Sequence, residues 1–545
     1  MFLKTCGGGL LGIACLSRLG VRGKNLLIQS GSCQIPLLPS CLIIYVLYCL
    51  NRNSVKLAHF SALLAGPAAF FLVLFLADLS PGHPEVTRMA AVTAWVALWW
   101  LTEATDLAVT ALLPFILIPI LGIADSQSVA AQYMDQTIFL FIGGVLLAFA
   151  IERWNLHQRI ALSILSKLGT NPATVLAGVM GATFFISMWV SNTATVMMML
   201  SAVMGIIIQV EKHNLSAVQK NAIARAMLLG LAYAASIGGM ATLVGTATNL
   251  AFYKIYLDAY KDAHDMNFVS WFVLAFPIAV LLLTTAFLIL QFSFLRQAKK
   301  VVFDRSYFVA SLRQLGKMAF EEKIVFTVFV STAYLWFGRK DIDFGSFHLT
   351  GWSHLLGTHA SFITDSTVAI VMALVLFLIP SKNEKGKMLM SWEEAKKLPI
   401  GIILLLGSGF ALAKGCDQSG LSTWLAQELL FLKDASPVVI IAGICVIVCV
   451  ISELASNVAC IQLVLPILIA IQKVTHLPPL MLMVPATLAA SLGFMLPVAT
   501  PPNTIVFGSG RIRAADMRNA GLVLDVAGIG IITAVSMIIR LIIWK

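Results

Sequence analysis

The stretch ISMWVSNTATVMMML, residues 186–200, places five small polar residues, Ser191 to Thr195, inside a long apolar segment. No Asp, Glu, Lys or Arg occurs between Asn171 and Val210. Burying a polar group without a partner costs free energy, so these side chains need something to bond. The stretch therefore indicates a site where uncharged donors and acceptors meet a ligand.

The composition of the chain indicates which solvent surrounds that site. Of 545 residues, 59% are hydrophobic and 12% are charged, against roughly 45–50% apolar residues in ordinary globular domains. Apolar runs of about 15 to 25 residues alternate with short polar loops, which is typical of helices that cross a bilayer. We expect an all-α polytopic membrane protein with about eleven to thirteen crossings or part-crossings.

The formal charge of +11 is concentrated in loops, where it sets orientation in the membrane and does not indicate nucleic-acid binding. Two apolar segments separate each neighbouring pair of basic loops, so all four should face the cytoplasm. We therefore expect an integral protein of the plasma membrane, or of the inner membrane in a bacterium. The four basic segments are 152–170, 211–225, 295–323 and 381–397.

The polar stretch has a counterpart later in the chain. GVLLAFAIERWNL (144–156) resembles GFALAKGCDQSGL (409–421) at an offset of 265 residues, because 409 − 144 = 265. The same offset, carried forward without a gap, predicts an internal repeat of the polar stretch. It matches Ser187 with Ser452, Ser191 with Ser456, and Asn192 with Asn457.

A second matched pair follows each polar stretch. GGMATLVGTATNLAF (238–252) resembles LGFMLPVATPPNTIVFG (492–508), with Asn249 opposite Asn503 at an offset of 254. Gly, Thr and Pro continue a helix poorly, so both segments should be helices interrupted within the membrane. Interruptions at corresponding positions of two halves of a chain are typical of a transporter's binding site.

The two repeats also have opposite surroundings. The first polar stretch lies between basic, cytoplasmic loops, whereas the second lies between segments poor in positive charge. We expect two inverted repeats, each with a re-entrant hairpin and a broken helix. The alternative is that each hairpin is two full spans with a polar turn at the far surface. Against it, neither tip has a charge, Gly or Pro within several residues, apart from Glu453.

These segments offer hydroxyls, amides and helix ends rather than charged side chains. Helix N-termini carry unpaired N–H groups and about half a positive charge, which suits carboxylate or sulfate oxygens. Carbonyl groups at helix breaks suit a small hard cation such as sodium. Sodium bound beside a dianion would offset its charge, so neither ion should bind well without the other.

Three motifs resemble those of the divalent anion/sodium symporter family, which includes sodium-coupled dicarboxylate, citrate and sulfate carriers. They accompany the paired Ser-Asn tips, and the resemblance covers about residues 60 to 545. The motifs are WWLTEATDLAVTALLP (99–114), TIFLFIGGVLLAFAIERWNLHQRIAL (137–162) and ATPPNTIVFGSG (499–510).

The resemblance implies a homodimeric transporter, not an enzyme, in which a transport domain moves against a scaffold domain as an elevator. It implies membrane lipid and a small dianionic substrate as partners, co-transported sodium ions, no organic cofactor and no nucleic acid. The implied divisions are an N-terminal extension (1–58), scaffold helices (59–165 and 296–435) and the two halves of the transport domain (166–295 and 436–545).

The resemblance also implies the site residues. Substrate contacts would be Ser191, Asn192, Thr193, Thr246, Ala247, Thr248, Ser456, Asn457, Thr500 and Pro501. The first sodium would lie among Ser187, Ser191, Asn192 and Gly245. The second would lie among Ser452, Ala455, Asn457 and Ala499.

Several residues depart from the family pattern or have two interpretations. Val458 replaces a Thr found in many second motifs, and TATN (246–249) replaces a Pro-containing version, so both bear on substrate choice. Leu200 and Ser201 stand where a Pro often follows the first tip. Glu453 is either a residue that tunes a sodium site or a hydrogen-bonded brace of the hairpin. A dicarboxylate or citrate symporter is the main hypothesis, with a sodium-independent dicarboxylate exchanger or a sodium-coupled sulfate transporter as alternatives.

Overall fold

The computed structural model describes residues 59–167, 170–212, 215–261, 266–297, 305–343 and 348–542, and the expected N-terminal extension lies outside them. In this part of the chain every regular element is helical except the short antiparallel pair β1 (Ile342–Asp343) and β2 (His348–Leu349). The predicted all-α class is therefore confirmed.

Nine helices of the described residues are long and apolar enough to cross a membrane. A tenth span is possible if the pair Trp352–Phe362 and Asp365–Leu378, bent by 108°, counts as one. Shorter apolar helices such as α9 (Pro172–Ser187) and α22 (Pro479–Ala489) supply part-crossings that the sequence count included. The nine are His59–Leu76, Ser126–Arg153, Asn192–Lys212, Ala217–Met240, Phe268–Ser293, Ile400–Gln418, Pro437–Leu454, Asn457–Thr475 and Ala514–Arg540.

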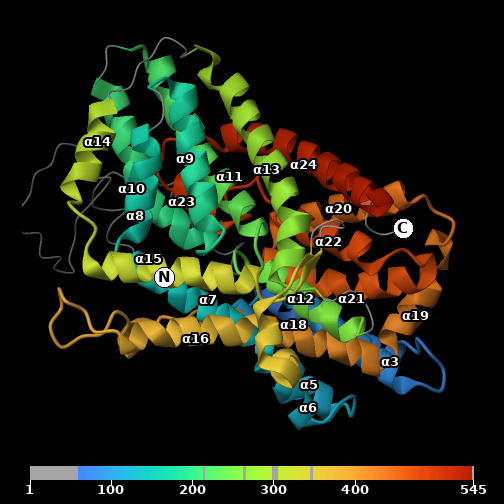
Figure 1. The fold of residues 1–545 in the computed structure, drawn as a ribbon. Coiled ribbons are helices and arrows are strands. Elements are labelled where there is room, and N and C mark those ends of the chain that lie inside the picture. Colours follow the sequence, from blue (N-terminus) through green and yellow to red (C-terminus); the bar gives the residue numbers. More distant parts are fainter. Residues whose placement is uncertain are drawn as a thin grey trace, which may run out of the picture. The chain divides into compact units, whose positions relative to one another are not determined.

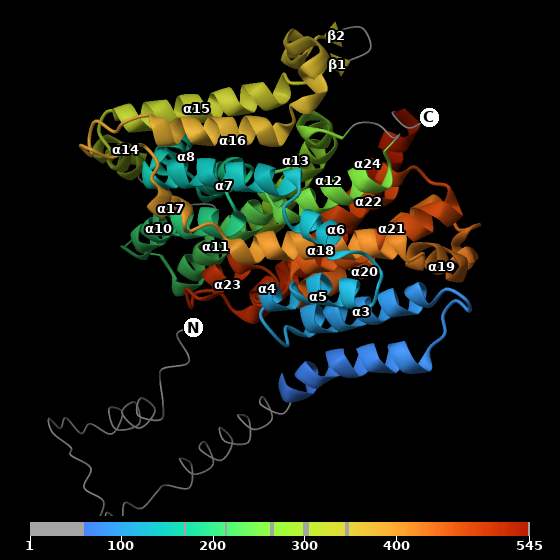
Figure 2. The same ribbon diagram turned by 90° about the horizontal axis from the view of Figure 1, so that it is seen from below.

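One apolar core joins helices of residues 84–133 to helices of residues 400–428. Its central side chains include Met89 and Trp100 of α3 and Leu412 of α18, all fully or almost fully buried. Figure 2 shows α3, α5 and α6 beside α18. The elements of this group are α3 (Pro84–Thr102), α4 (Leu107–Thr110), α5 (Leu113–Ile120), α6 (Ser126–Tyr133), α18 (Ile400–Gln418) and α19 (Leu421–Glu428).

A second group packs three long helices side by side, α7 (Gln136–Arg153), α15 (Phe320–Phe337) and α16 (Asp365–Leu378) (Figures 1 and 2). Helices α7 and α16 approach closely at Gly143, where an added Cβ would lie 2.6 Å from the Cβ of Ala369. A side chain at residue 143 would push the two backbones apart, so this packing requires glycine.

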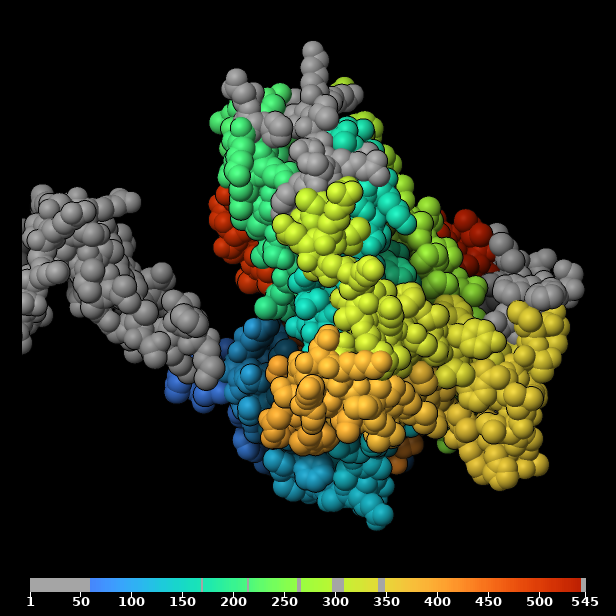
Figure 3. Space-filling view, turned by 60° about the vertical axis from the view of Figure 1, so that its left-hand side comes forward, coloured from blue at the N-terminus to red at the C-terminus, as the bar shows by residue number. Residues whose placement is uncertain are grey.

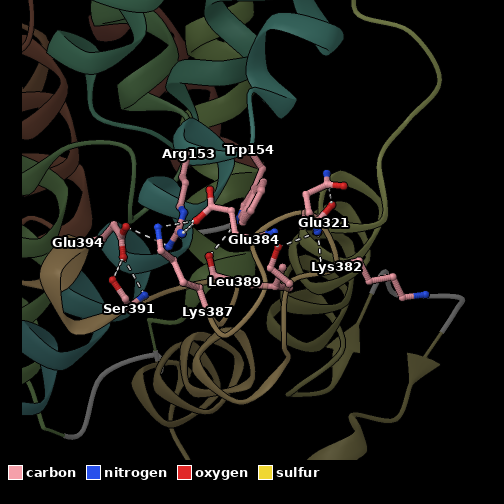
Figure 4. Close-up of polar contacts among 11 residues, drawn as sticks. Arg153, Trp154, Glu321, Lys382, Glu384, Lys387, Leu389, Ser391 and Glu394 are labelled. Atoms are coloured by element: carbon pink, nitrogen blue, oxygen red, sulfur yellow. Dashed lines mark hydrogen bonds and ion pairs between the residues drawn. The ribbon is translucent and has the colours of Figure 1, made fainter.

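Polar contacts join the end of α7 to the segment 380–399 (Figure 4). The Arg153 guanidinium lies 2.9 Å from a Glu384 oxygen and 3.0 Å from a Glu394 oxygen. The indole N–H of Trp154 donates to the carbonyl of Leu389 at 2.9 Å. In Figure 3 the orange chain that includes the segment 380–399 lies against the yellow-green α14–α15 region.

Glu321, at the start of α15, holds the other end of the same segment. Its Oε1 accepts hydrogen bonds of 2.8 Å from the Ser381 hydroxyl and from the backbone N–H groups of Lys382 and Asn383. Burial alone would raise the pKa of Glu321, but these hydrogen bonds, with Asn383 the largest, outweigh it and lower the pKa. The segment is therefore fixed by an ionised carboxylate.

These contacts test the prediction that the basic segments lie on one side of the membrane. Arg153 reaches Glu384, and Arg159 pairs with Glu322 at 2.8 Å. The basic segments 152–170, 295–323 and 381–397 therefore lie on one side of the protein, as predicted. That this side faces the cytoplasm stays a prediction.

The remaining helices form two hairpins and two broken helices, and each hairpin also contacts the broken helix of the other repeat. Helix α10 packs against α23, and α21 packs against α12. This exchange brings segments from the first and second repeats into one cluster. The hairpins are α9–α10 (Pro172–Ser187 and Asn192–Lys212) and α20–α21 (Pro437–Leu454 and Asn457–Thr475). The broken helices are α11–α12 (Ala217–Met240 and Ala247–Ala259) and α22–α23 (Pro479–Ala489 and Pro501–Phe507).

Two long helices cover this cluster, and short helices complete the described chain. Both α13 and α24 pack against it and against each other. The long helices are α13 (Phe268–Ser293) and α24 (Ala514–Ile542). The short ones are α8 (Leu156–Lys167), α14 (Arg305–Gln314), α17 (Trp392–Ala395), and the 3-10 helices η1 (Leu295–Gln297), η2 (Trp352–Phe362) and η3 (Leu430–Leu432).

Candidate binding site

The tip of the first hairpin is fastened by a buried serine. Helix α9 ends at Ser187 and α10 begins at Asn192. The Ser187 Oγ lies 2.8 Å from Asn192 Oδ1 and 2.7 Å from the carbonyl oxygen of Ala235 in α11. One hydroxyl therefore fixes the amide of Asn192 and joins the tip to the neighbouring broken helix.

The second hairpin repeats this arrangement. The Ser452 Oγ lies 2.8 Å from Asn457 Oδ1, and it also contacts the carbonyl oxygen of Ala490. Both members of the serine–asparagine pair are shifted by 265 residues from the first hairpin, since 452 − 187 = 457 − 192 = 265. The repeat predicted from the sequence is therefore present at the level of individual hydrogen bonds.

Both breaks are held open by an asparagine side chain. In the first, the Asn249 Nδ2 group donates to the carbonyls of Gly239 at 3.0 Å and Thr242 at 2.7 Å. In the second, Asn503 Nδ2 donates to those of Gly493 at 2.9 Å and Leu496 at 3.0 Å. Each acceptor pair follows the predicted offset, because 493 − 239 = 496 − 242 = 254. These bonds satisfy carbonyls that lost their helical partners.

The first tip lies directly against the first break. A Cβ added to Gly239 would come within 3.0 Å of Asn192 Nδ2 and closer still to Oδ1. The Thr242 hydroxyl also donates to the carbonyl of Met188 at 2.5 Å. Glycine at residue 239 is therefore what allows the tip to seat on the broken helix.

The contact of Ser452 with Ala490 bears on whether the second hairpin is re-entrant. Helix α22 has 11 residues before the second break, which corresponds to about 16 Å at 1.5 Å per residue. That is about half of a hydrocarbon core of roughly 30 Å. The second tip contacts a break at this depth and so lies within the core, which favours a re-entrant second hairpin over two full spans with a surface turn.

The expected site residues fall into two burial classes. The expected sodium ligands other than Ser191, Asn192 and Asn457 are all buried, namely Ser187, Gly245, Ser452, Ala455 and Ala499. Most substrate residues at the tips are partly accessible: Ser191 is exposed, and Asn192, Thr193, Ser456 and Asn457 are half-buried. Thr246 is half-buried, Pro501 is exposed, and Ala247, Thr248 and Thr500 are buried. The structure brings each tip to its own break, whereas no hydrogen bond of the described residues joins one tip to the other.

The electrostatics of the tips come from the backbone. None of the residues 186–196, 240–250, 454–460 and 497–505 is charged. Within the described chain, the hydrogen bonds and ion pairs of the tip residues include no Lys or Arg. Helices α10 and α21 begin at Asn192 and Asn457, so each tip presents unpaired N–H groups and the positive end of a helix dipole.

Glu453 lies one residue beyond Ser452 and braces the second break. Its Oε1 accepts from the N–H of Met495 at 2.7 Å, and its Oε2 accepts from that of Leu496 at 3.0 Å. Of the two interpretations given above, the structure therefore supports the hydrogen-bonded brace.

Sequence reasoning used Asn249 and Asn503 to align the repeats but did not give them a role. Their position next to Gly, Thr and Pro in a charge-free segment is the signal that could have identified them, because the carbonyls of a break need an internal donor. Tyr233 was missed altogether. Its hydroxyl lies 3.3 Å from the carbonyl oxygens of both Phe494 and Met517, which joins α11 to the second break and to α24.

The arrangement can hold an anion and cations side by side. The tips offer N–H groups and amides to the anion, while buried hydroxyl and carbonyl oxygens suit a small hard cation. The described residues contain no cluster of three or more His, Cys, Asp or Glu side chains that could hold a metal ion.

Comparison with known proteins supports this interpretation. The chain matches the family model of the sodium:sulfate symporter transmembrane region over residues 57–544. It is 38% identical over 499 residues to a sodium-dependent dicarboxylate transporter, SdcS, of Staphylococcus saprophyticus, covering 90% of this chain and 94% of that protein. It is also 38% identical over 466 residues to SdcS of Staphylococcus aureus, covering 84% and 87%.

Two solved structures share the fold at low sequence identity. MtrF of Neisseria gonorrhoeae, described as an antimetabolite efflux pump, has a TM-score of 0.51 at 14% identity, over 77% of this chain and 84% of that one. The YdaH transporter of Alcanivorax borkumensis also has a TM-score of 0.51, at 13% identity over 84% and 99%. With the family model covering almost the whole chain, the protein is an integral membrane transporter that belongs to the sodium:sulfate symporter, or divalent anion/sodium symporter, family.

Proposed function

We propose that this protein is a secondary active transporter that moves a C4-type dicarboxylate, such as succinate, malate or fumarate, or citrate, together with sodium ions. The observation that carries the proposal is the pair of uncharged Ser-Asn tips, each fastened to a broken helix by a buried serine in the same way. The 38% identity to sodium-dependent dicarboxylate transporters over 90% of the chain supports the choice of substrate class.

The substrate carboxylates bind at the N-termini of α10 and α21. The hydrogen bonds of the described chain leave the backbone N–H groups of Asn192, Thr193, Asn457 and Val458 without a partner. A carboxylate oxygen at these groups receives charge-assisted hydrogen bonds and a favourable interaction with the helix dipole. Ser191 and Ser456 add hydroxyls at the accessible rim, with Thr246 to Thr248 and Thr500–Pro501 on the two broken helices.

Sodium ions bind behind the tips and reduce the cost of burying a dianion. The oxygens of Ser187 and Asn192, with the backbone at Gly245, form the first sodium site. The second sodium site is formed by the oxygens of Ser452, Ala455, Asn457 and Ala499. Because no Lys or Arg neutralises the substrate, the sodium ions supply the positive charge, and substrate affinity should increase steeply with sodium concentration.

The two hairpins and two broken helices form the transport domain, residues 166–295 and 436–545. They move as one body against the scaffold formed by residues 59–165 and 296–435, which pairs with a second copy in a homodimer. The tightness of the first tip-to-break contact supports movement as a unit, because Gly239 leaves no free space between the tip and the break.

Two other functions can be distinguished by transport assays. A sodium-independent exchanger would catalyse counterflow of dicarboxylate without sodium, and a sulfate transporter would be inhibited by sulfate more than by succinate. The choice of dicarboxylate over sulfate is supported by the relatives, and Val458, which removes a hydroxyl from the second tip, is the residue to vary first.

The test is uptake of radiolabelled succinate into proteoliposomes under an inward sodium gradient, with potassium in place of sodium as the control. Uptake that needs sodium and is inhibited by unlabelled dicarboxylate supports the proposal. Equal uptake in both salts would contradict sodium coupling, and inhibition by sulfate alone would contradict the substrate. Asn192→Ala and Asn457→Ala should abolish uptake while leaving folded protein.

A further inference from the structure

A cavity of about 470 Å³ lies between α8 and the turn that follows α14. Figure 1 shows these two helices side by side. The described residues that line the cavity include three cations and no acid, and they are Arg159, Ser163, Leu312, Arg313, Gly316 and Lys317. Small-ligand sites have volumes of roughly 300–1,000 Å³. The cavity is therefore large enough for a ligand, and its charge suits an anion.

Arg159 holds the wall of this cavity in place. Its Nε donates to Glu322 Oε2 at 2.8 Å, while Nη1 and Nη2 donate to the carbonyls of Gly316 at 3.0 Å and Leu315 at 3.2 Å. The arginine and glutamate side chains are 14% and 11% exposed. Gly316 has a φ of 67°, which glycine adopts without strain. The turn after α14 is therefore fixed by the protein itself, before any ligand binds.

The other two cations of the cavity, Arg313 and Lys317, have no counter-charge among the described residues. The two acids at the start of α15, Glu321 and Glu322, are both engaged elsewhere. Glu322 pairs with the arginine of the wall at 2.8 Å, and Glu321 accepts hydrogen bonds from the segment that follows α16. Two cations that line one cavity repel each other, and an anion between them would replace this repulsion by attraction.

The donors of the cavity indicate the kind of anion. A guanidinium binds two oxygens of a phosphate at once, and a lysine ammonium binds phosphate as a point charge. The Ser163 hydroxyl adds a third donor from α8. A phosphate monoester has three acceptor oxygens and nearly two negative charges, which match these three donors and the two unpaired cations. The Ser-Asn tips contain no cation, so this cavity differs in chemistry from the proposed substrate site.

The surroundings of the cavity favour a lipid as the carrier of the phosphate. Helix α15 begins at Phe320, shortly after the turn, and exposes Phe326, Val330 and Tyr334 by 43%, 46% and 74%. These three residues are four apart and so share one apolar face of the helix. In a membrane protein such a face suits acyl chains, and basic pockets between helices bind anionic headgroups.

We propose that the cavity between α8 and α14 binds a phosphate monoester through Arg313, Lys317 and Ser163, and that an anionic lipid headgroup supplies it. The bound group links α8 to the turn after α14 and neutralises two cations. Because the ligand binds the folded chain and not the unfolded one, it stabilises the protein. The site does not depend on which anion is transported.

Thermal melting of the purified full-length protein in potassium tests the proposal without any transport measurement. The probe is dioctanoyl phosphatidic acid, a phosphate monoester on short chains, added at constant ionic strength. It should raise the melting temperature of the wild type, and Arg313→Gln/Lys317→Gln should need at least about tenfold more lipid for the same shift. Lys396→Gln/Lys397→Gln is the matched control, because these lysines are exposed, lie outside the cavity and change the net charge equally. It should respond as the wild type.

Further comparisons separate the sources of the anion. Arg313→Lys keeps the charge but not the fork, so it should fold normally and bind phosphatidic acid more weakly than the wild type. Inorganic phosphate that gives an equal shift, lost in Arg313→Gln/Lys317→Gln, would overturn a lipid as the source. Equal responses of both double variants to phosphatidic acid would overturn the site. A shift with succinate that only Arg313→Gln/Lys317→Gln loses would also overturn it, by indicating a second dicarboxylate site.

Discussion

Gly239→Ala should weaken sodium and substrate binding by displacing the first tip. The new Cβ would lie 3.0 Å from Asn192 Nδ2, where ordinary contact begins at 3.4 Å, and it would be closer still to Oδ1. The amide must therefore move by at least about 0.4 Å, from 3.4 − 3.0. The bond from Ser187 holds the amide, so this movement is opposed.

The expected magnitude follows from the cost of overpacking. Such a cost is about 1–3 kcal/mol, which corresponds to a factor of roughly 5 to 150 in a binding constant at about 1.4 kcal/mol per tenfold. The apparent affinity for sodium should fall by a factor in this range. The fall should be greater in Gly245→Ala, where the Cβ would meet the backbone carbonyl of Gly239 at 2.5 Å and no side chain can turn away.

The assay is succinate uptake by proteoliposomes over a series of sodium concentrations. Gly181→Ala in α9 is the matched control, because nothing lies within 4 Å of a Cβ at that residue, and it should behave as the wild type. If Gly239→Ala shows the same sodium dependence as Gly181→Ala, then the Asn192 amide is not part of the sodium or substrate site, and the reasoning is refuted.

Three other predictions follow from the same contacts. Gly521→Ala should lower thermal stability and uptake because its Cβ would meet the backbone of the second break. Gly530→Ala on the same helix has open space around its Cβ and should be neutral. Equal melting temperatures for the two variants would contradict the packing. Ser187→Ala and Ser452→Ala should each reduce sodium affinity, since leaving a buried polar group without its partner costs about 1–3 kcal/mol; an unchanged sodium titration for both would exclude them as ligands or braces. Glu321 has a lowered pKa in the folded protein, so the stability it contributes is complete above its unfolded pKa and is lost as the pH falls through its folded pKa. The melting temperature should therefore drop less steeply in acid for Glu321→Gln than for the wild type. Parallel curves of melting temperature against pH would contradict this contribution of Glu321.

Much of the fold could be predicted because the bilayer constrains sequence strongly. Apolar runs indicated the helices, and the basic segments that the charge pattern placed together are joined by ion pairs such as Arg159–Glu322. The offset of 265 matched Ser187 with Ser452 and Asn192 with Asn457, and the structure shows the same bond in both pairs. Repeats are predictable in this way because equal sequences in equal surroundings make equal contacts.

Other parts of the site depend on contacts between segments that no sequence pattern predicts to be neighbours. The approach of Gly521 to Met495 depends on how α24 lies across the second break. Hydrophobic periodicity gives the face of a helix that is buried but not its partner. The brace formed by Glu453 left two interpretations open in the sequence for the same reason.

The role of the asparagines in the breaks could be predicted only in part. Their alignment was visible, but the acceptors of Asn249 and Asn503 are backbone carbonyls, which carry no side-chain signal. Only the geometry of the break shows that one amide replaces the lost helical donors.

In the proposed function, sodium rather than a basic side chain supplies the positive charge that a bound dicarboxylate needs. Calorimetric titration of the purified protein with succinate, in sodium and in potassium at equal ionic strength, measures this directly. We expect binding in sodium and none in potassium. Succinate binding of equal affinity in both salts would contradict the claim.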